Sequence, residues 1–178
     1  GLNRFSDLWF DGPERVRWAA CYGGIDFGSS DCLAEKGFSF AAHELTEGVW
    51  LNVYNLHAEA GGGPEDIEAR RAGLAQLADF ILERSAGHAV LVGGDTNLHG
   101  FDRDDEPLLE ALLEDTGLVD VCRHLGCGDE HIDRFFFRSL PAEDAPAGGP
   151  AIELIPHAWR VAEEFVTPDG APLSDQDP

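Results

Sequence analysis

The sequence predicts a mixed α/β domain, and three observations in its middle third carry that prediction. Residues 49–57 (VWLNVYNLH) alternate along a run of β-favouring side chains, which indicates a buried strand. Apolar residues at helical spacing follow, and a short continuous apolar run comes next at residues 89–92. We therefore expect a strand, a helix and a second strand in this order, within one domain over residues 1–178.

The helix of this unit has a predicted start and a predicted end. Three glycines form a turn signal before Pro64, and proline suits the first turn of a helix. Gly87 suits the end of the helix. The apolar positions at helical spacing are Ile67, Leu74, Leu77, Ala78 and Ile81.

The remaining elements follow from the same patterns. The apolar run Ala89–Val92 is ended by two glycines, as expected for a central strand that is buried on both faces. Later segments predict a helix after Pro107 and two further strands, at Ile132–Phe137 and Ala158–Phe165. Strands outnumber helices in this prediction.

The composition limits the possible partners. The chain has 34 acidic and 12 basic side chains among 178 residues, so its formal net charge is −22. This charge repels a phosphate backbone and argues against a broad basic surface for duplex nucleic acid, although a small or metal-bridged phosphate site stays compatible with it. No run of apolar residues approaches the roughly 20 that span a bilayer.

The four cysteines, at positions 21, 32, 122 and 127, fall into two close pairs. An even number of cysteines without any methionine favours an oxidising compartment, so we expect the disulfides Cys21–Cys32 and Cys122–Cys127. Two alternatives stay open. The thiols could be reduced, or the second pair could bind zinc with two nearby histidines, although its spacing fits no common zinc finger well.

Asp95 and Asn97 directly follow the second strand in the segment GGDTN, where open sheets place their binding sites. Carboxylate and amide oxygens suit a hard cation such as Mg²⁺, or Mn²⁺ or Ca²⁺ in its place, which can bridge to a phosphate. One alternative is an Asx-type turn. Another is a calcium loop of the EF-hand type over residues 95–106, but such a loop needs a helix before it rather than a strand.

Asn55 and His57 lie on one face at the end of the first strand, so an imidazole could approach Asp95 and exchange protons near neutral pH. A lone histidine at a strand end is more often a surface or packing residue. The residues that lie beside it decide between this role and a catalytic one. The acidic residues Asp102, Asp104, Asp105 and Glu106 are expected to form a solvated edge.

Five short motifs occur in an order that resembles the endonuclease/exonuclease/phosphatase superfamily. They are KGFSFA at 36–41, NLH at 55–57, GGDTN at 93–97, IDRFFFR at 132–138 and LSDQDP at 173–178. The stretch at 31–37 and the late cysteine pair look most like secreted bacterial members related to neutral sphingomyelinases and DNase I. The resemblance implies a four-layered α/β sandwich of the DNase I-like type and metal-dependent phosphoester hydrolysis, in which water attacks phosphorus.

The resemblance also implies roles for single residues. His57 would lie near the leaving oxygen, Asp95 would orient or activate the water, and Asn97 would hold a phosphate oxygen. Asp175 would be a carboxylate on the metal side, and Asp95 and Asn97 are further candidate metal ligands. Asp133 would steer a histidine that is expected directly after Asp175.

This histidine is replaced by Gln176, because the family pattern Ser-Asp-His-Asp-Pro reads SDQDP over residues 174–178. An amide cannot exchange a proton near neutral pH. General acid–base catalysis contributes about 10²–10⁴ in rate, so we expect a loss of at least that order relative to a histidine-bearing relative.

The resemblance further implies an N-terminal portion with an early Asn and a metal-ligating Glu, neither of which precedes Gly1. We therefore expect the C-terminal portion of a longer domain. Its sheet edges would be exposed unless a second chain or the missing segment covers them.

The leading hypothesis is a secreted, Mg²⁺-dependent phosphodiesterase or phosphatase, weakened by Gln176 and by the missing segment. A phospholipid head group or a small phosphodiester is favoured as substrate over duplex DNA, although a cation-bridged nuclease can also be acidic. The alternative is a non-catalytic homologue that acts as a binding or structural module.

Overall fold

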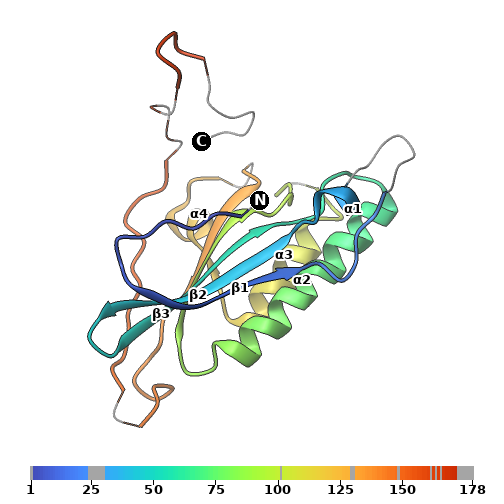
Figure 1. Cartoon of the computed structure of the whole chain (residues 1–178). Coiled ribbons are helices and arrows are strands. Elements are labelled where there is room, and N and C mark those ends of the chain that lie inside the picture. Colours follow the sequence, from blue (N-terminus) through green and yellow to red (C-terminus); the bar gives the residue numbers. More distant parts are fainter. Residues whose placement is uncertain are drawn as a thin grey trace.

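A six-stranded mixed sheet forms the centre of the computed structural model (Figure 1). The structure describes residues 2–23, 31–100, 102–128, 131–147, 149–160, 162, 164 and 166–171. The strands lie in the order β1-β2-β3-β4-β6-β5, and each neighbouring pair is antiparallel except β3 and β4. The sheet is therefore mixed, and together with the helices it confirms the predicted α/β domain.

The strands are β1 (Phe10–Arg17), β2 (Gly37–Thr46), β3 (Val49–His57), β4 (Ala89–Asp95), β5 (Val119–Asp120) and β6 (Asp133–Arg138). The helices are α1 (Asp31–Ala34), α2 (Pro64–Arg84), α3 (Glu106–Thr116) and α4 (Val121–Leu125).

The central β3-α2-β4 unit agrees with the sequence prediction. β3 has the predicted bounds, and α2 begins at Pro64, where the Asp66 carboxylate accepts a hydrogen bond from the Gly63 backbone N–H at 3.0 Å. The helix ends at Arg84, three residues before the predicted Gly87. β4 begins at Ala89 and continues to Asp95, because the two glycines after the apolar run stay paired with both neighbouring strands.

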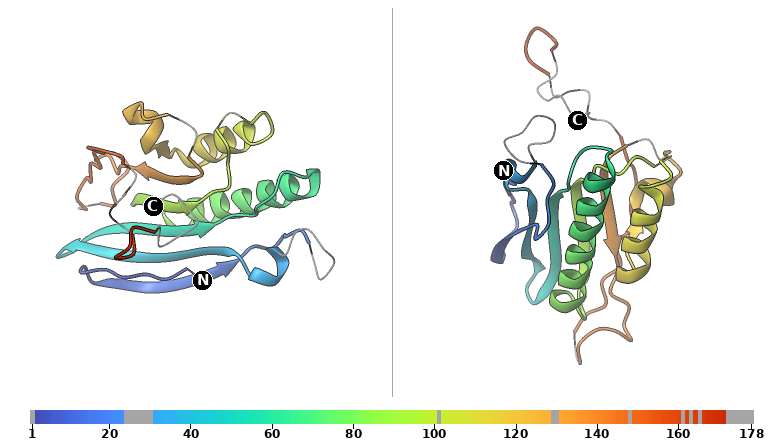
Figure 2. Two further views of the ribbon diagram at one scale, coloured as in Figure 1. Left: turned by 90° about the horizontal axis from the view of Figure 1, so that it is seen from above. Right: turned by 90° about the vertical axis from the view of Figure 1, so that its right-hand side faces the viewer.

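Helices α2 and α3 cover one face of the sheet, as the right view of Figure 2 shows, where both lie in front of the strands. The main core lies between these layers and includes many side chains that are almost completely buried, such as Phe38, Tyr54, Leu77, Val92 and Phe136. Each large apolar side chain of this kind stabilises the fold by about 1.5–3 kcal/mol. The helix layer and the sheet layer are two of the four layers that the resemblance implies.

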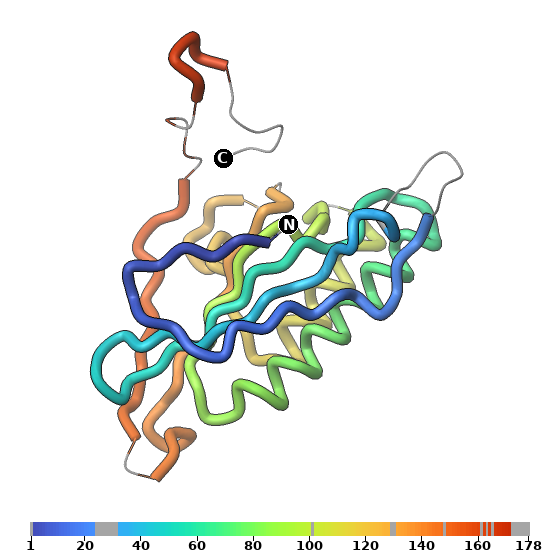
Figure 3. Tube along the Cα trace, in the orientation of Figure 1, coloured from blue at the N-terminus to red at the C-terminus, as the bar shows by residue number. Residues whose placement is uncertain are grey.

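Segments from both ends of the described chain lie on the opposite face of the sheet (Figure 3). Near the N-terminus, Arg4 donates hydrogen bonds to the Val53 carbonyl at 3.0 Å and to Ser39 Oγ at 3.4 Å. Near the C-terminus, Leu140 pairs with Ile152 in an isolated bridge, and both pack in a smaller apolar cluster. No helix in the described part of the chain is long and apolar enough to cross a membrane.

The prediction of a strand at Ala158–Phe165 is wrong for the residues described there, since 158–160, 162 and 164 form no strand. No described strand pairs with this segment, and an alternating pattern alone does not make a strand without a partner. The predicted strand at 132–137 is confirmed as β6, with its bounds shifted by one residue at each end.

Both predicted disulfides are present. Cys21 is bonded to Cys32, and Cys122 is bonded to Cys127, so all four cysteines are oxidised. The alternatives of four reduced thiols and of a zinc site at the second pair are therefore wrong, because a disulfide sulfur is not a thiolate ligand.

Candidate active site

One transverse row of residues, here called the polar row, crosses five strands at the end where β3 and β4 finish. Its members are paired in register as Arg17–Gly37, Gly37–His57, His57–Asp95 and Asp95–Asp133. Residues paired in this way point to the same face of a sheet. Side chains alternate between the two faces along a strand. Leu56, next to His57, and Phe136, three residues after Asp133, point into the core under the helices. The polar row therefore lies on the opposite face of the sheet.

His57 and Asp95 are the central members of the polar row. The imidazole Nε2 lies 3.4 Å from Asp95 Oδ2, close enough for an ion pair when the ring is protonated. The His57 side chain is 45% exposed and that of Asp95 is 14% exposed. The histidine is therefore accessible to a ligand, whereas the carboxylate beside it is mostly shielded from water.

The backbone after β4 turns sharply at Asn97, which has a left-handed φ of 50°. Asp95 Oδ1 accepts a hydrogen bond from the Asn97 N–H at 2.9 Å, so the Asx-type turn considered from the sequence is present. The turn uses Oδ1, while Oδ2 faces His57. Asn97 Nδ2 donates to the Ala58 carbonyl at 3.1 Å, which joins the turn to the loop after β3.

Asp95 and Asp133 face each other across β4 and β6. Two like charges directly opposite on neighbouring strands repel each other. Carboxylate oxygens are among the ligands that a hard divalent cation prefers. Among the described residues alone, no three His, Cys, Asp or Glu side chains form a cluster that could hold a metal ion.

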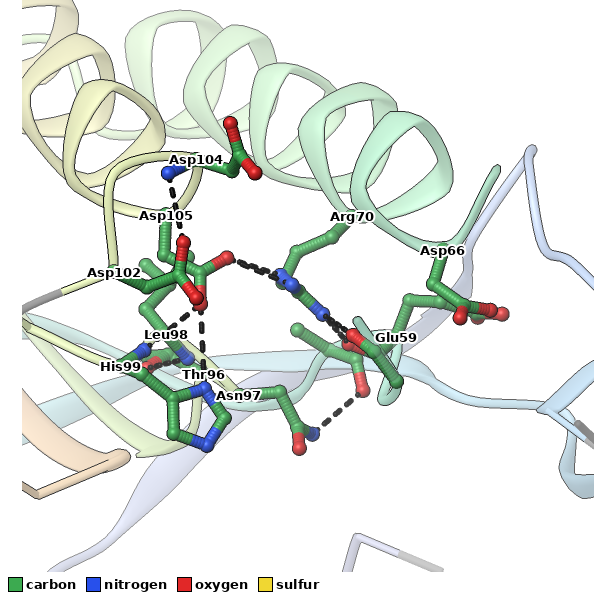
Figure 4. A network of polar contacts seen from close by, with 12 residues as sticks. Glu59, Asp66, Arg70, Thr96, Asn97, Leu98, His99, Asp102, Asp104 and Asp105 are labelled. Atoms are coloured by element: carbon green, nitrogen blue, oxygen red, sulfur yellow. Dashed lines mark hydrogen bonds and ion pairs between the residues drawn. The ribbon is translucent and has the colours of Figure 1, made fainter. Parts of the chain in front are cut away.

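A buried ion pair supports the two loops that follow β3 and β4 (Figure 4). The Arg70 guanidinium donates to Asp105 Oδ1 at 2.7 Å and 3.1 Å, and also to the Glu59 and Gly61 carbonyls at 2.8 Å and 3.0 Å. Asp105 Oδ2 accepts from the His99 N–H at 3.0 Å. Asp105 is therefore buried, and the expectation of a solvated edge is wrong for this residue.

Two sequence-predicted residues, Asp175 and Gln176, lie outside the described residues. The structure brings His57, Asp95, Asn97 and Asp133 together at one end of the sheet. The EF-hand alternative is wrong, because residues 89–95 enter the loop as a strand and not as a helix. Sequence reasoning missed Arg17 as a member of the polar row, since only the register of β1 against β2 reveals it.

Comparison with known proteins relates the chain to phosphoester hydrolases. It is 31% identical over 193 residues to sphingomyelinases of Mycobacterium tuberculosis and Mycobacterium bovis, a match that covers 100% of this chain and 35% of each relative. The chain thus spans about a third of the length of these curated relatives. No protein-family model matches it.

Solved structures give the fold. Sphingomyelinase C from Streptomyces griseocarneus is similar with a TM-score of 0.57 at 18% identity, over 75% of this chain and 50% of that one. The human Nocturnin catalytic domain with bound sulfate is similar with a TM-score of 0.53 at 14% identity, over 75% and 51% of the two chains. At these identities the likeness establishes the DNase I-like architecture.

Proposed function

The chain belongs to the endonuclease/exonuclease/phosphatase superfamily of phosphoester hydrolases, and from this premise we propose that the polar row is the centre of a metal-dependent phosphodiester hydrolase. The observation that carries the proposal is the register of His57, Asp95 and Asp133 on three adjacent strands. An accessible imidazole beside the Asp95 carboxylate, with the Asp133 carboxylate on the next strand, would supply a proton-transfer group and oxygen ligands within one site.

The cation is proposed to be held by Asp95 and Asn97 together with Asp175. Asn97 uses one N–H of its amide on the Ala58 carbonyl, so its Oδ1 is the part of the side chain that a cation would contact. Asp95 contributes a carboxylate that the Asx-type turn already orients. A bound Mg²⁺ supplies electrostatic stabilisation of the charge that develops on the phosphoryl oxygens. Mn²⁺ or Ca²⁺ could occupy the same oxygen ligands.

The protein residues position the reacting groups. Asp95 Oδ2 lies 3.4 Å from His57 Nε2 and orients the ring, which in its protonated form can donate a hydrogen bond to the leaving oxygen. Asp133, on β6, adds a second carboxylate directly opposite Asp95 on β4. Gln176, in place of the family histidine, can donate a hydrogen bond but cannot transfer a proton near neutral pH. We therefore expect slow turnover, by about 10²–10⁴ relative to a histidine-bearing relative.

The proposed substrate is a phospholipid head group or another small phosphodiester. The match to sphingomyelinases supports a phosphoester on a lipid, and the net charge of −22 opposes a broad contact with duplex DNA. Two disulfides suit an oxidising compartment, so we propose that the protein acts outside the cell.

Hydrolysis of bis(p-nitrophenyl) phosphate with added MgCl₂ tests the proposal. Asp95→Asn keeps an oxygen for the Asx-type turn but removes the charge, so we expect at least about a 100-fold loss of kcat/KM. Asp79→Asn is the matched control, because Asp79 is exposed on α2 and far from the polar row in the fold. Gln176→His should increase kcat by at least about tenfold. Equal rates in wild type and Asp95→Asn would contradict the proposal.

A second candidate function is a non-catalytic binding module, and Gln176 is the observation that favours it. This candidate predicts that wild type and Gln176→His both lack turnover although the folded protein still binds Mg²⁺. Isothermal titration with MgCl₂ beside the rate assay distinguishes it from the hydrolase.

A further inference from the structure

A cavity of about 510 Å³ opens beside His57, at the β1 end of the polar row. Its lining contains Arg15, Arg17 and Lys36 together with Glu35. These three cations are a quarter of the 12 lysines and arginines in the chain, and Lys36 is its sole lysine. In a protein with a net charge of −22, such a concentration of basic side chains at one cavity needs a physical explanation.

Gly37 creates the space between the basic side chains and the histidine. It lies in register between Arg17 and His57, so the central position of this part of the row has no side chain. A Cβ atom at Gly37 would lie 2.1 Å from the Val16 carbonyl oxygen, closer than any real contact. The close approach of β1 and β2 therefore requires glycine here, and the same glycine leaves the floor of the cavity open.

Each basic residue is held at the cavity by a separate feature. Arg15 lies one pleat from Arg17 on the same face of β1, because the two are separated by one residue. Lys36 Nζ donates to the Ala58 carbonyl at 3.2 Å, which ties it to the residue after His57. Arg17 Nη1 forms an ion pair with Glu35 Oε1 at 3.2 Å, and both side chains are largely exposed, at 58% and 70%. Among the described residues that line the cavity, three are basic and one is acidic.

We propose that this cavity is an anion subsite of the active site, which takes a second negatively charged group of the substrate. The row then has an acidic half at Asp95 and Asp133, of which Asp95 would contribute to the cation site, a histidine in the middle, and a basic half for an anion. The preferred substrate class is a phosphodiester that carries an additional phosphate or carboxylate on one ester arm. The proposal rests on the proposed function for its kinetic part, whereas binding of an anion can be tested without turnover.

The kinetic test compares two substrates of nearly equal shape, the p-nitrophenyl phosphodiesters of glycolic acid and of glycolamide. They differ in one negative charge. For wild type we expect kcat/KM to be about fivefold or more higher for the charged substrate, in line with one partly exposed ion pair. This ratio should fall towards one in Lys36→Gln and in Arg17→Gln. Arg71→Gln, on the exposed side of α2, is the matched control and should keep the wild-type ratio.

The binding test uses inorganic phosphate in the presence of EDTA, so that no divalent cation can hold the anion at the acidic half of the row. Isothermal titration should give a dissociation constant that rises at least about fivefold in Lys36→Gln and stays within about twofold of wild type in Arg71→Gln. Circular dichroism of each variant checks that it is folded. Arg17→Gln provides a second variant, since the Arg17 side chain is largely exposed and its loss should not disturb packing.

The two arms separate the possible failures. Phosphate binding that depends on Lys36, without turnover of either ester, would support the subsite and contradict the proposed hydrolase. Equal turnover of both esters, with no phosphate binding or with equal binding in all variants, would overturn the subsite and leave the hydrolase standing. A substrate ratio that changes equally in Arg71→Gln would also overturn it, because the effect would then come from net charge alone.

Discussion

Gly93 and Gly94 are neighbours in β4, but a methyl group at each would meet a different obstacle. At Gly94 the Cβ atom would lie 2.1 Å from the Leu56 carbonyl oxygen, and φ is 137°. At Gly93 it would lie 2.8 Å from the ring edge of Phe135, whose side chain is half exposed and can turn away. Glycine is thus required at position 94 by the neighbouring backbone, whereas at position 93 only a movable side chain opposes a larger residue.

We therefore expect Gly94→Ala to destabilise the protein by more than about 3 kcal/mol, and Gly93→Ala to cost about 1 kcal/mol or less. Urea denaturation followed by circular dichroism measures both losses. Similar losses in the two variants would show that the ring of Phe135 is as rigid as the backbone, contrary to this reading.

His43 makes the fold sensitive to acid. Burial and, to a smaller extent, the nearby Arg4 guanidinium lower the pKa of the imidazole from its usual 6.5. Arg4 donates to Nε2 at 2.9 Å, so the neutral ring must carry its proton on Nδ1, which lies 3.2 Å from Ser6 Oγ. Protonation of Nε2 would replace this hydrogen bond by two facing donors.

Because the folded-state pKa of His43 is depressed, its contribution to stability is complete above pH 6.5 and is lost as the pH falls below it. We expect the free energy of unfolding to fall as the pH drops below 6.5, and to fall less steeply in His43→Gln, which still offers Arg4 an acceptor. Carboxylates titrate in the same range in both proteins, so the difference in slope between them is the measurement. Parallel slopes would contradict the role of His43.

The sequence predicted the positions of single residues in the fold better than their surroundings. His57, Asp95 and Asn97 could be singled out because each lies at the predicted end of a strand. Asp105 could not be placed, because its partner Arg70 is 35 residues away and only the packing of α2 against α3 brings them together. Acidic runs look alike in sequence whether their members are solvated or paired.

Between α2 and α3, the Arg70–Asp105 ion pair is the main polar connection (Figure 4). Both side chains are almost completely buried, with 2% and 4% exposure. Removing one partner from such a pair leaves a buried charge uncompensated, which costs about 3–5 kcal/mol. The same guanidinium also holds the loop after β3 through two carbonyls, so the pair positions both loops of the candidate site.

Asp105→Asn should therefore destabilise the protein by about 3–5 kcal/mol in urea denaturation. Glu68→Gln is the matched control, because Glu68 forms an exposed ion pair with Arg71 on the same helix, and it should have no measurable effect. The loss in Asp105→Asn should also persist in high salt, since a buried pair is poorly screened. If the loss of stability in Asp105→Asn disappeared in high salt, the Arg70–Asp105 ion pair would be exposed to solvent and not buried.

Elements were predictable where the periodicity was long or the ends were marked. The 21-residue α2 has both features, and β3 and β4 have strong apolar patterns. β1 was missed because it contains a proline and a glycine near a bulge, which an edge strand tolerates and a central strand does not. Ala158–Phe165 was overpredicted for the opposite reason, since its pattern alternates but it has no described partner strand.

Because the whole molecule has a net charge of −22, any added salt affects its stability, and this general effect must be separated from specific binding of a cation. Added salt screens repulsion among all surface carboxylates and should stabilise the protein in general, because the Debye length falls to about 10 Å at 0.1 M ionic strength. A cation bound at Asp95 adds a separate, saturable stabilisation, because the folded state binds it and the unfolded state does not.

We therefore expect MgCl₂ to raise the melting temperature by more than NaCl at equal ionic strength. With Mg²⁺ at about tenfold its dissociation constant, binding contributes about 1.4 kcal/mol, or roughly 3–6 °C for a chain of this size. The additional shift should vanish in Asp95→Asn and persist in Asp79→Asn, two variants that lose the same charge from different places. Equal shifts with both salts in all three proteins would mean that divalent cations act on this molecule by screening alone, and the acidic half of the polar row would then have no bound metal.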